Sequence, residues 1–400
     1  MSGRIVLGLG GTVDHELVWD AAVLQRLVDG HGIALAELED GPGSEARSGR
    51  ELVLDVLRSM RRGVGCEVFV RDRADLFAFD ACFSYRVTLG GTCVRAALAL
   101  SRIGVGSTVH LVSMSEEVRR LLPAEVEWVC SADGDSLDPH VIVQYPAGAR
   151  IRVTDGEVVA TRPNRVILVN DPPNERMLLS PRLPQLLGSA CAVAASGFNT
   201  MKSQVLLRSR LAELERALAR VPAGVPVVYE DAGFHDESLR TVVLETVRRC
   251  FTLHSLNEDE AQRYLGRAVD LADPAQVARM MTDLLALLGA PTVMVHTSRY
   301  AAVIGADTER YREAAEAGCL MASTRFLHAD GYTRADYESV ARAPHEEVGT
   351  VLAASAAVRD AGVRIAPGFD VRTDSPTTIG LGDAFIGGVM GNLTDRKSVV

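Results

Sequence analysis

Lysine is almost absent from this chain of 400 residues. The only lysines are Lys202 and Lys397, although lysine and arginine together number 42. A phosphate-binding loop of the Walker type needs a lysine inside its glycine-rich segment, and neither lysine occupies such a segment, so that class of nucleotide site is excluded. Cationic contacts to phosphate must therefore come from guanidinium groups.

Basic clusters, long apolar runs and paired cysteines are also missing. The net charge is −10, so nucleic acid is not expected as a partner. No apolar run approaches the roughly 18 residues that cross a membrane. The seven cysteines show no CxxC spacing, and an odd number cannot all pair, which favours a reducing compartment. Because the first residues, MSGRIVLGLGG, carry no targeting pattern, we expect a cytoplasmic protein that binds small molecules.

Short β-branched runs alternate with longer segments of helical periodicity. The expected strands are Arg4–Leu9, Ser107–Val112, Ala192–Ser196, Val225–Tyr229, Phe251–Ser255 and Thr292–His296. The expected helices are Val94–Ile103, Gln204–Ala219, Glu237–Arg249, Pro274–Leu288 and Glu346–Ala361. This alternation predicts an α/β fold with a central, mostly parallel sheet flanked by helices, and ligands at the carboxyl ends of its strands.

Two stretches break the alternation with period-two strands separated by turns. We expect a small antiparallel β-sheet inserted as a lid at about 63–91 and 139–179. The large α/β domain would then take about 1–62, 92–138 and 180–400, and the whole chain 1–400 would form one unit. A lid of this kind closes over a substrate in many phosphoryl-transfer enzymes. The alternative is that these strands only extend the edge of the main sheet.

The most informative motif lies near the C-terminus, where Gly380, Leu381, Gly382 and Asp383 precede an apolar helical pattern. Glycines allow a tight turn, and the first helical turn presents free N–H groups and a positive dipole end to an anion. A carboxylate beside bound phosphate suits a general base that takes a proton from an incoming hydroxyl. The alternative is that Asp383 only caps the helix.

This GLGD motif resembles the active-site loop of the ribokinase-like superfamily, and its leucine is similar to the ADP-dependent glucokinases and phosphofructokinases. Other segments follow in the same order over most of the chain. The resemblance implies a phosphotransferase that acts on an alcohol group, with ADP as donor and Mg²⁺ as cofactor. It also implies catalytic roles for residues 380–383, with Asp383 near the metal, and a nucleotide contact at Thr378.

Two further segments resemble the nucleotide side of that family. Asn257 and Glu260 match its NxxE motif, which implies that Asn257 binds the nucleotide and that Glu260 holds Mg²⁺; an ordinary capping box is the alternative. His296 and Thr297 are similar to its HT segment near the nucleotide, although a histidine at a strand end is often only structural. Glu230 occupies the place of the metal-binding glutamate in an HxE motif whose histidine is replaced by valine in this chain.

The acceptor side is implied by the N-terminal half. Residues that match the family's sugar pocket are Asp14, Glu67, Gly90, Gly91, Thr92 and Asn199. A carboxylate can accept hydrogen bonds from two hydroxyls, which suits Asp14 for binding a polyol. Glu67 favours glucose, because a carboxylate repels a phosphorylated sugar. Paired glycines also occur in plain strand-to-helix turns, which is the alternative for Gly90 and Gly91.

Together these motifs predict an ADP-dependent sugar kinase that transfers the β-phosphate to glucose or fructose 6-phosphate and releases AMP. Two alternatives remain: an ATP-dependent kinase of a nucleoside or another sugar, and a non-catalytic sensor that binds a nucleotide or sugar. A dinucleotide site at Gly8–Gly11 is disfavoured because Val13 occupies the sixth position of that fingerprint, where a small residue is needed. The sequence carries no indication of the oligomeric state.

Overall fold

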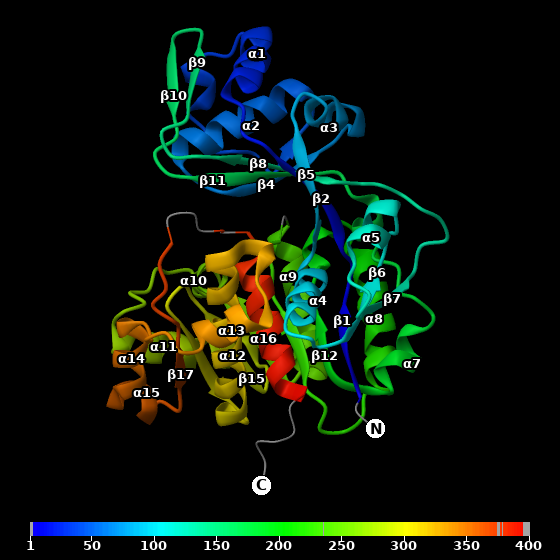
Figure 1. The fold of residues 1–400 in the computed structure, drawn as a ribbon, viewed down its shortest axis with the longest axis vertical. Helices are drawn as coiled ribbons and strands as arrows, with labels where there is room; N and C mark the ends of the chain where they lie inside the picture. The colour runs from blue at the N-terminus through cyan, green and yellow to red at the C-terminus, as the bar shows by residue number, and fades with distance from the viewer. Residues whose placement is uncertain (1–2, 235, 374–376, 378, 395–400) are drawn as a thin grey trace.

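A computed structural model of the protein describes residues 3–234, 236–373, 377 and 379–394. The chain forms a large unit built on one sheet and a smaller unit built on another, stacked along the long axis of the molecule (Figure 1). The described part of the chain begins and ends at the foot of the large unit (Figure 1). None of the helices in the described ranges combines the length and the apolar character needed to cross a bilayer.

The sheet of the large unit has nine strands in the order β17-β16-β15-β14-β13-β12-β1-β6-β7. Its strands are β1 (Arg4–Gly8), β6 (Ser107–Leu111), β7 (Val126–Cys130), β12 (Ala190–Ala195), β13 (Val227–Glu230), β14 (Leu253–Asn257), β15 (Thr292–His296), β16 (Tyr300–Gly305) and β17 (Arg364–Pro367). Every pair from β15 to β7 is parallel, whereas β16 pairs antiparallel with both β15 and β17. The predicted mostly parallel sheet is confirmed.

Helices cover both faces of this sheet because its central strands are apolar on both sides. On β1, Ile5 and Leu7 pack with α4, α12 and α16, whereas Val6 packs with α7, α8 and α9 on the other face. The helices of the large unit are α4 (Thr92–Arg102), α5 (Glu116–Leu121), α6 (Pro172–Arg176), α7 (Leu183–Leu187), α8 (Gln204–Leu218), α9 (Glu237–Cys250), α10 (Glu258–Leu265), α11 (Pro274–Leu288), α12 (Thr308–His328), α13 (Arg334–Val340), α14 (Glu347–Ala354), α15 (Ala356–Asp360) and α16 (Leu381–Thr394). Short 3-10 helices occupy Phe198–Thr200 and Ala329–Gly331.

One helix differs from its predicted form, and one long helix was not predicted. The helix expected over Glu346–Ala361 is divided into α14 and α15 at Ser355. The long helix α12 carried no clear amphipathic pattern because α16 packs tightly along it through glycines. A side chain at Gly388 would collide with the carbonyl oxygen of Ala317, and one at Gly318 would collide with the Phe385 ring.

The small unit contains a separate six-stranded sheet in the order β3-β4-β11-β8-β2-β5, so its strands do not extend the large sheet. Its strands are β2 (Thr12–Leu17), β3 (Glu45–Ala46), β4 (Cys66–Val70), β5 (Tyr85–Gly90), β8 (His140–Tyr145) and β11 (Asn164–Val169). A hairpin of β9 (Arg150–Val153) and β10 (Gly156–Val159) lies beside it. Only β11–β8 and β2–β5 pair antiparallel, so the sheet is mixed and not purely antiparallel as expected.

More of the N-terminal region belongs to the small sheet than the expected boundary at residue 63 implies. The strands β2 and β3 join this sheet, and α1 (Ala21–His31), α2 (Gly49–Arg62) and α3 (Arg73–Asp80) share its core. Leu17, Val53 and Leu57 are buried there. An amphipathic helix shows the same periodicity whichever sheet it covers, so the pattern of α2 could not reveal this partner.

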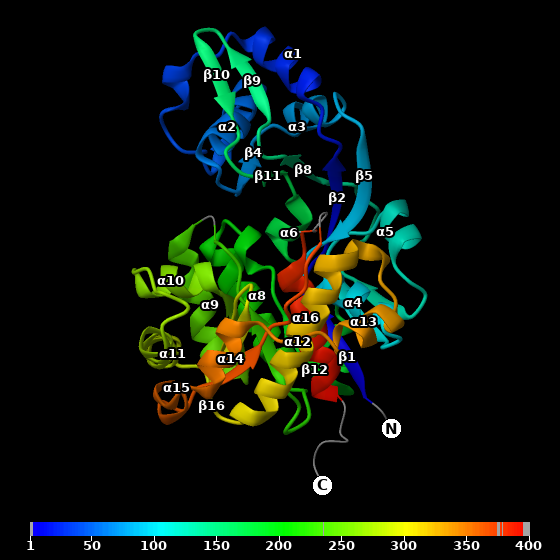
Figure 2. The ribbon, with the colours of Figure 1, turned by 60° about the vertical axis from the view of Figure 1, so that its left-hand side comes forward.

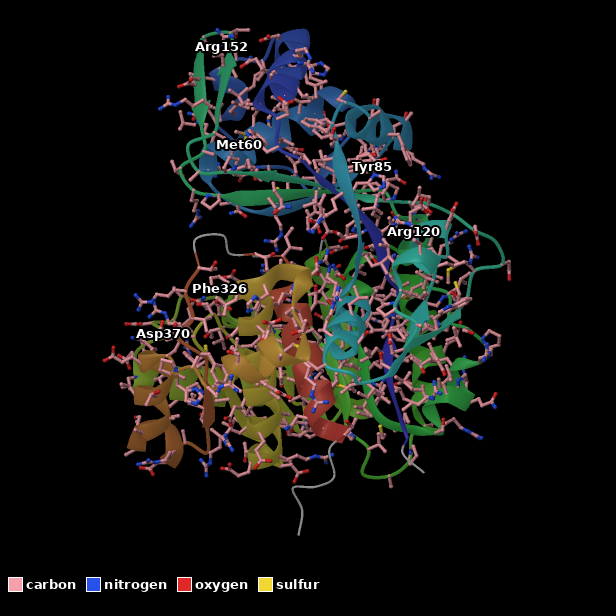
Figure 3. All side chains as sticks on the ribbon, viewed as in Figure 1. Met60, Tyr85, Arg120, Arg152, Phe326 and Asp370 are labelled. Carbon is pink, nitrogen blue, oxygen red and sulfur yellow. The ribbon has the colours of Figure 1, made fainter. Side chains whose placement is uncertain are left out.

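The two units are joined by the strand pair β2–β5, which runs from the large unit into the small one (Figure 2). The ring of Tyr85, labelled on β5 in Figure 3, stacks on His15 of β2 with centroids 4.0 Å apart. A second contact between the units is made by Lys202 of the large unit, which lies over the ring of Phe69 on β4 of the small sheet. The same lysine pairs with Glu175 of the large unit. The small sheet is thereby held above the carboxyl ends of the large sheet's strands.

Candidate active site

A cavity of about 700 Å³ lies between the two sheets. It collects residues that the sequence analysis took from distant segments, namely Glu67, Thr92, Asn199, Glu230, Asn257, Glu260, His296, Gly380, Leu381, Gly382 and Asp383. They meet because parallel strands direct the turns at their carboxyl ends to one edge of the sheet. The small sheet contributes Glu67, so the cavity is enclosed by both units.

A second cavity of about 690 Å³ adjoins the first and shares Arg165, Asn257, His296, Leu381 and Gly382 with it. Its other walls are partly apolar, with Phe326, Phe369, Val371 and Phe385. Figure 3 places Phe326 at the edge of the large unit that faces the small sheet. An apolar slot beside polar groups suits a flat heterocycle that carries phosphates.

Asp383 is the third residue of α16 and faces the first cavity. Gly380 adopts φ +68, and its carbonyl accepts the N–H of Ala384, so the helix begins at Leu381. Within the described part of the chain, the N–H groups of Leu381, Gly382 and Asp383 have no acceptor, and the Asp383 carboxylate accepts no helix N–H. Asp383 is therefore not a capping residue there, and its side chain is 23% exposed.

A buried arginine, Arg95 of α4, lies between Asp383 and Asp14. Its Nη2 donates to Asp14 Oδ2 at 2.8 Å, and its Nε lies 3.9 Å from Asp383 Oδ2. Burial lowers the pKa of Arg95, but the charges of Asp14 and Asp383 outweigh this effect and raise it. Arg95 is thus a permanent cation beside the proposed base.

Asp14, expected to read sugar hydroxyls, lies behind the cavity wall. It is 4% exposed, and its Oδ1 accepts from Thr12 at 2.6 Å while Oδ2 accepts from Arg95. A side chain at Gly90 would collide with Thr12 and Asp14, and Gly91 needs φ +84 to pass Gly11 closely. The two glycines therefore serve the close approach of strands, and neither they nor Asp14 line the two cavities above.

Glu230 and His296 form a buried pair at the floor of the first cavity. His296 Nε2 lies 2.9 Å from Glu230 Oε1, and its ring stacks on Phe385 with centroids 4.6 Å apart. Burial lowers the pKa of His296, but the carboxylate of Glu230 more than offsets this and raises it. Val228, which replaces the motif's histidine, is fully buried in the core of the large unit.

Asn257 and Glu260 form the capping box that the sequence left as an alternative. Asn257 Oδ1 accepts from the N–H of Glu260, and Glu260 Oε2 accepts from the N–H of Asn257, each at 2.9 Å. Both side chains nevertheless line the first cavity. Burial, together with the nearby charges of Asp231 and Glu230, raises the pKa of Glu260 to about 7.

The carboxylates here fit Mg²⁺ as the family resemblance implies. The described residues contain no group of three ligands already placed around a metal position. Mg²⁺ binds through one or two carboxylates and otherwise keeps water and phosphate oxygens, so a preformed cage is not required. Glu230 Oε2 is buried and has no partner in the described part of the chain, which leaves one anionic oxygen available beside Glu260.

One expected nucleotide contact, Thr297, has a local structural role. The Thr297 hydroxyl donates to the carbonyl of Tyr300 and accepts from the N–H groups of Arg299 and Tyr300, so it closes the turn between β15 and β16. Thr297 also lines the second cavity. Thr378 lies outside the described residues.

Arg165 is a residue that the motifs did not assign to the site. It comes from β11 of the small sheet and lines both cavities, and its guanidinium has no ion-pair or hydrogen-bond partner among the residues described. Burial lowers its pKa, against the attraction of Asp383. Its sequence signal was a cation in a period-two strand of the expected lid, in a stretch that resembles the lid of the family. Asp231 and Arg263 also line the first cavity and carried no motif.

One family model matches nearly the whole chain. A model of the conserved region of ADP-specific phosphofructokinase and glucokinase matches residues 3–386. A phosphofructokinase structure from Pyrococcus horikoshii OT3 with AMP is 17% identical, with a TM-score of 0.76 over 98% of this chain and 97% of that one. No curated protein sequence matches the chain.

Two other solved structures are similar over nearly their whole length. An ADP-dependent kinase in complex with fructose 6-phosphate and ADPβS is 16% identical, with a TM-score of 0.76 over 99% of this chain and 95% of that one. The last common ancestor of ADP-dependent phosphofructokinases from Methanosarcinales is 16% identical, with a TM-score of 0.75 over 100% and 95%. At these identities the likeness concerns the fold, and it agrees with the predicted α/β architecture of a mostly parallel sheet flanked by helices with a smaller sheet beside it.

Proposed function

Because the chain belongs to the ADP-specific phosphofructokinase/glucokinase family, we propose that it transfers the β-phosphoryl group of ADP to a sugar hydroxyl and releases AMP. The observation that carries this proposal is the position of Asp383. Its carboxylate faces a cavity enclosed by both sheets, next to backbone N–H groups that have no acceptor in the described chain. A base and an anion-binding helix terminus are thereby side by side.

In this proposal Asp383 accepts the proton of the attacking hydroxyl. The N–H groups of residues 381–383 stabilise the charge that spreads over the equatorial phosphoryl oxygens. Arg165 would add a guanidinium from the opposite unit, since it borders both cavities and has no partner of its own in the described chain. Closure of the small unit would then bring this cation toward the transferred group.

Glu260 and Glu230 would hold Mg²⁺, either directly or through water. Bound there, the ion would neutralise phosphate charge and orient the donor. Asn257 caps α10 and keeps the Glu260 carboxylate in place through the N–H that it donates. His296 fixes one oxygen of Glu230, and the other, which is buried and has no partner in the described chain, would be the one offered to the ion.

The acceptor that the first cavity favours is a neutral sugar, with glucose as the leading candidate. Its wall carries six carboxylates, those of Glu67, Glu230, Asp231, Glu237, Glu260 and Asp383. Arg165 and Arg263 are the arginines of the same wall. An excess of carboxylates disfavours an acceptor that brings a second phosphate, because like charges repel at short range.

Fructose 6-phosphate is the second candidate, and a specific observation favours it. The guanidinium of Arg165 has no carboxylate partner in the described part of the chain, and a guanidinium binds a phosphate with two parallel hydrogen bonds. If Arg165 binds the 6-phosphate of the acceptor, it is not needed for the transferred group. Acceptor preference therefore distinguishes the two roles of this arginine.

The test is a panel of donors and acceptors. ADP and ATP would each be incubated with Mg²⁺ and with glucose, fructose 6-phosphate, ribose or a nucleoside, and products would be identified by ³¹P NMR. We expect AMP and glucose 6-phosphate from ADP and glucose, and an Asp383→Asn protein should lose roughly 10²–10⁴ of the turnover with little change in ADP affinity. Transfer from ATP alone would contradict the donor assignment. Tight ligand binding without turnover would instead identify a sensor.

A further inference from the structure

Arg95 is a charged side chain in the apolar interior of the large unit. It is 6% exposed, and its neighbours on α4, Val94 and Ala96, belong to the main hydrophobic core. Burying a cation is costly unless carboxylates compensate for the lost water. The carboxylates that contact Arg95 therefore indicate which function justifies a buried cation at this position.

Three carboxylates from two units surround its guanidinium. Nη2 lies 2.8 Å from Asp14 Oδ2 and 3.6 Å from Glu16 Oε1, whereas Nε lies 3.9 Å from Asp383 Oδ2. Asp14 and Glu16 lie on β2, which enters the small unit, and Asp383 lies on α16 of the large unit. One planar side chain thus connects the proposed base to the strand that carries the small sheet.

A second series of ion pairs leads from β2 and β5 to the turn before α16. Glu16 pairs with Arg86 of β5 at 2.6 Å, and Arg86 lies 3.7 Å from Asp330. Asp330 pairs with Arg325 at 2.5 Å, and Arg325 Nε donates to the carbonyl of Ile379 at 2.9 Å. The first route therefore ends at Asp383 in the first turn of α16, and the second ends at Ile379, directly before this helix.

Gly380 is the point where the two routes meet. A Cβ atom there would lie 3.1 Å from Arg95 Cδ and 3.3 Å from Arg325 Nε. The turn before Asp383 is consequently packed between two buried arginines. The orientation of the carboxylate depends on groups that do not themselves face the first cavity.

We propose that Arg95 is a positioning residue, whose guanidinium holds Asp383 of the large unit and Asp14 of the strand leading to the small unit in one fixed relation. This inference rests on the proposed function, in which Asp383 is the base. Its consequence is that the base and the start of β2 keep one fixed relation. Loss of Arg95 then lowers kcat and raises the KM for the sugar but leaves the KM for ADP unchanged.

The structure also offers a route for chemical rescue. A cavity of about 250 Å³ is lined by Arg95, Arg86, Arg102 and Arg325 and lies outside the two cavities of the proposed site. Free guanidinium ion can therefore reach the space vacated in an Arg95→Ala protein. Arg102, on the same helix and the same cavity wall, is exposed and makes no ion pair within the described part of the chain. Arg102→Ala is thus the matched control.

The experiment compares wild type, R95A, R95K and R102A with the best donor and acceptor of the panel, with and without millimolar guanidinium chloride. For R95A we expect kcat about 10²-fold lower, since small displacements of a catalytic group cost this much. The KM for the sugar should rise about tenfold, because β2 belongs to the sheet that brings Glu67 and Arg165 to the cavity wall and would lose its fixed relation to Asp383. Guanidinium should restore part of both values in R95A and change nothing in R102A.

A merely structural role gives a different pattern. If R95A only folds less well, the active fraction falls, so apparent kcat drops while every KM stays the same and guanidinium does not help; this result overturns the proposal. Should R95A fail to fold, R95K decides, because it keeps the charge but not the planar group. We expect R95K to lose roughly tenfold in kcat with a raised sugar KM. Wild-type constants in R95K would refute the proposal.

The outcome separates this inference from the proposed function. If wild type transfers phosphate and Asp383→Asn does not, while the Arg95 variants behave as wild type, only the positioning role is refuted. If wild type transfers no phosphate from any donor, the proposed function fails and the positioning role fails with it.

Discussion

His296 holds only one of the two carboxylate oxygens of Glu230. The pair is 2.9 Å apart through Oε1, and Oε2 is buried without a partner in the part of the chain that the structure describes. A buried anionic oxygen without a partner is costly, and a bound cation or its water would relieve that cost. Glu230 is therefore the carboxylate on which metal binding can be tested most directly.

We expect Glu230→Gln to raise the Mg²⁺ concentration for half-maximal activity by about 10–100-fold, as is typical when a group around a metal site is altered. Titration of activity with MgCl₂ measures this. Glu237→Gln is the matched control, because Glu237 lines the same cavity but is half-exposed and paired with Arg240. Equal Mg²⁺ dependence in wild type and Glu230→Gln would remove Glu230 from the metal site.

Arg165 should lower the stability of the ligand-free protein while it supports ADP binding and turnover. Its partly buried guanidinium has no ion-pair partner in the described chain, so the ligand-free protein bears the cost of an uncompensated cation. We expect Arg165→Met to be at least as heat-stable as wild type without ligand, to gain less stability from ADP, and to turn over roughly 10²-fold more slowly. Thermal unfolding with and without ADP, combined with kinetics, measures all three.

Arg152→Met serves as the control for Arg165→Met, since Arg152 is exposed on the β9–β10 hairpin far from the large unit (Figure 3). It should match wild type in each measurement. If Arg165→Met keeps the full stabilisation by ADP and the full rate, Arg165 binds neither the donor nor the transferred group.

The part of the site that follows from the large sheet was predictable from the sequence. The range Thr292–His296 coincides with β15, and the bounds of the strands that end at Glu230 and Asn257 were located to within two residues. Once these strands are parallel and adjacent, their carboxyl ends must share one edge. Local patterns therefore sufficed to bring Glu230, Asn257 and His296 to one cavity.

Features of the site that depend on contacts between residues distant in sequence could not be predicted. Asp14 was expected to face the sugar, but Arg95 of α4 and Thr12 hold its carboxylate behind the wall. The one local signal was Arg95 itself, a charge set between Val94 and Ala96 on an apolar helix face. Arg165 was expected in the lid and lies on β11 of the small sheet, but its place on the cavity wall could not be predicted, because the strand pattern does not specify which face of a small sheet lies over the large unit.

Stability should fall in alkali because of the pair His140–Asp171, which lies between β8 and α6. The two side chains are buried and 3.1 Å apart. Burial lowers the pKa of His140, but the hydrogen bond and charge of Asp171 outweigh it and raise this pKa to about 9. The unfolded chain releases the same proton near pH 6.5. The contribution of the pair is therefore complete below pH 6.5 and is lost as pH rises through about 9.

We expect the unfolding midpoint of wild type to decline between pH 7 and 10 more steeply than that of His140→Asn. Calorimetry across this range measures the difference. His328→Asn, at an exposed position at the end of α12, should follow the wild-type curve. Parallel curves for wild type and His140→Asn would mean that the pair carries no proton linkage in this range.

The turn before Asp383 can be tested through Gly380, with Gly224 as its matched control. Both glycines adopt positive φ, +68 and +80, so alanine at either position should cost about 1–2 kcal/mol of unfolding free energy. A side chain at Gly224 meets nothing within 4 Å, whereas one at Gly380 presses on Arg95 and Arg325. We therefore expect both variants to lose similar stability in urea unfolding, but only Gly380→Ala to lose turnover, by roughly tenfold or more. Equal turnover in the two variants would show that the position of Asp383 does not depend on this packing.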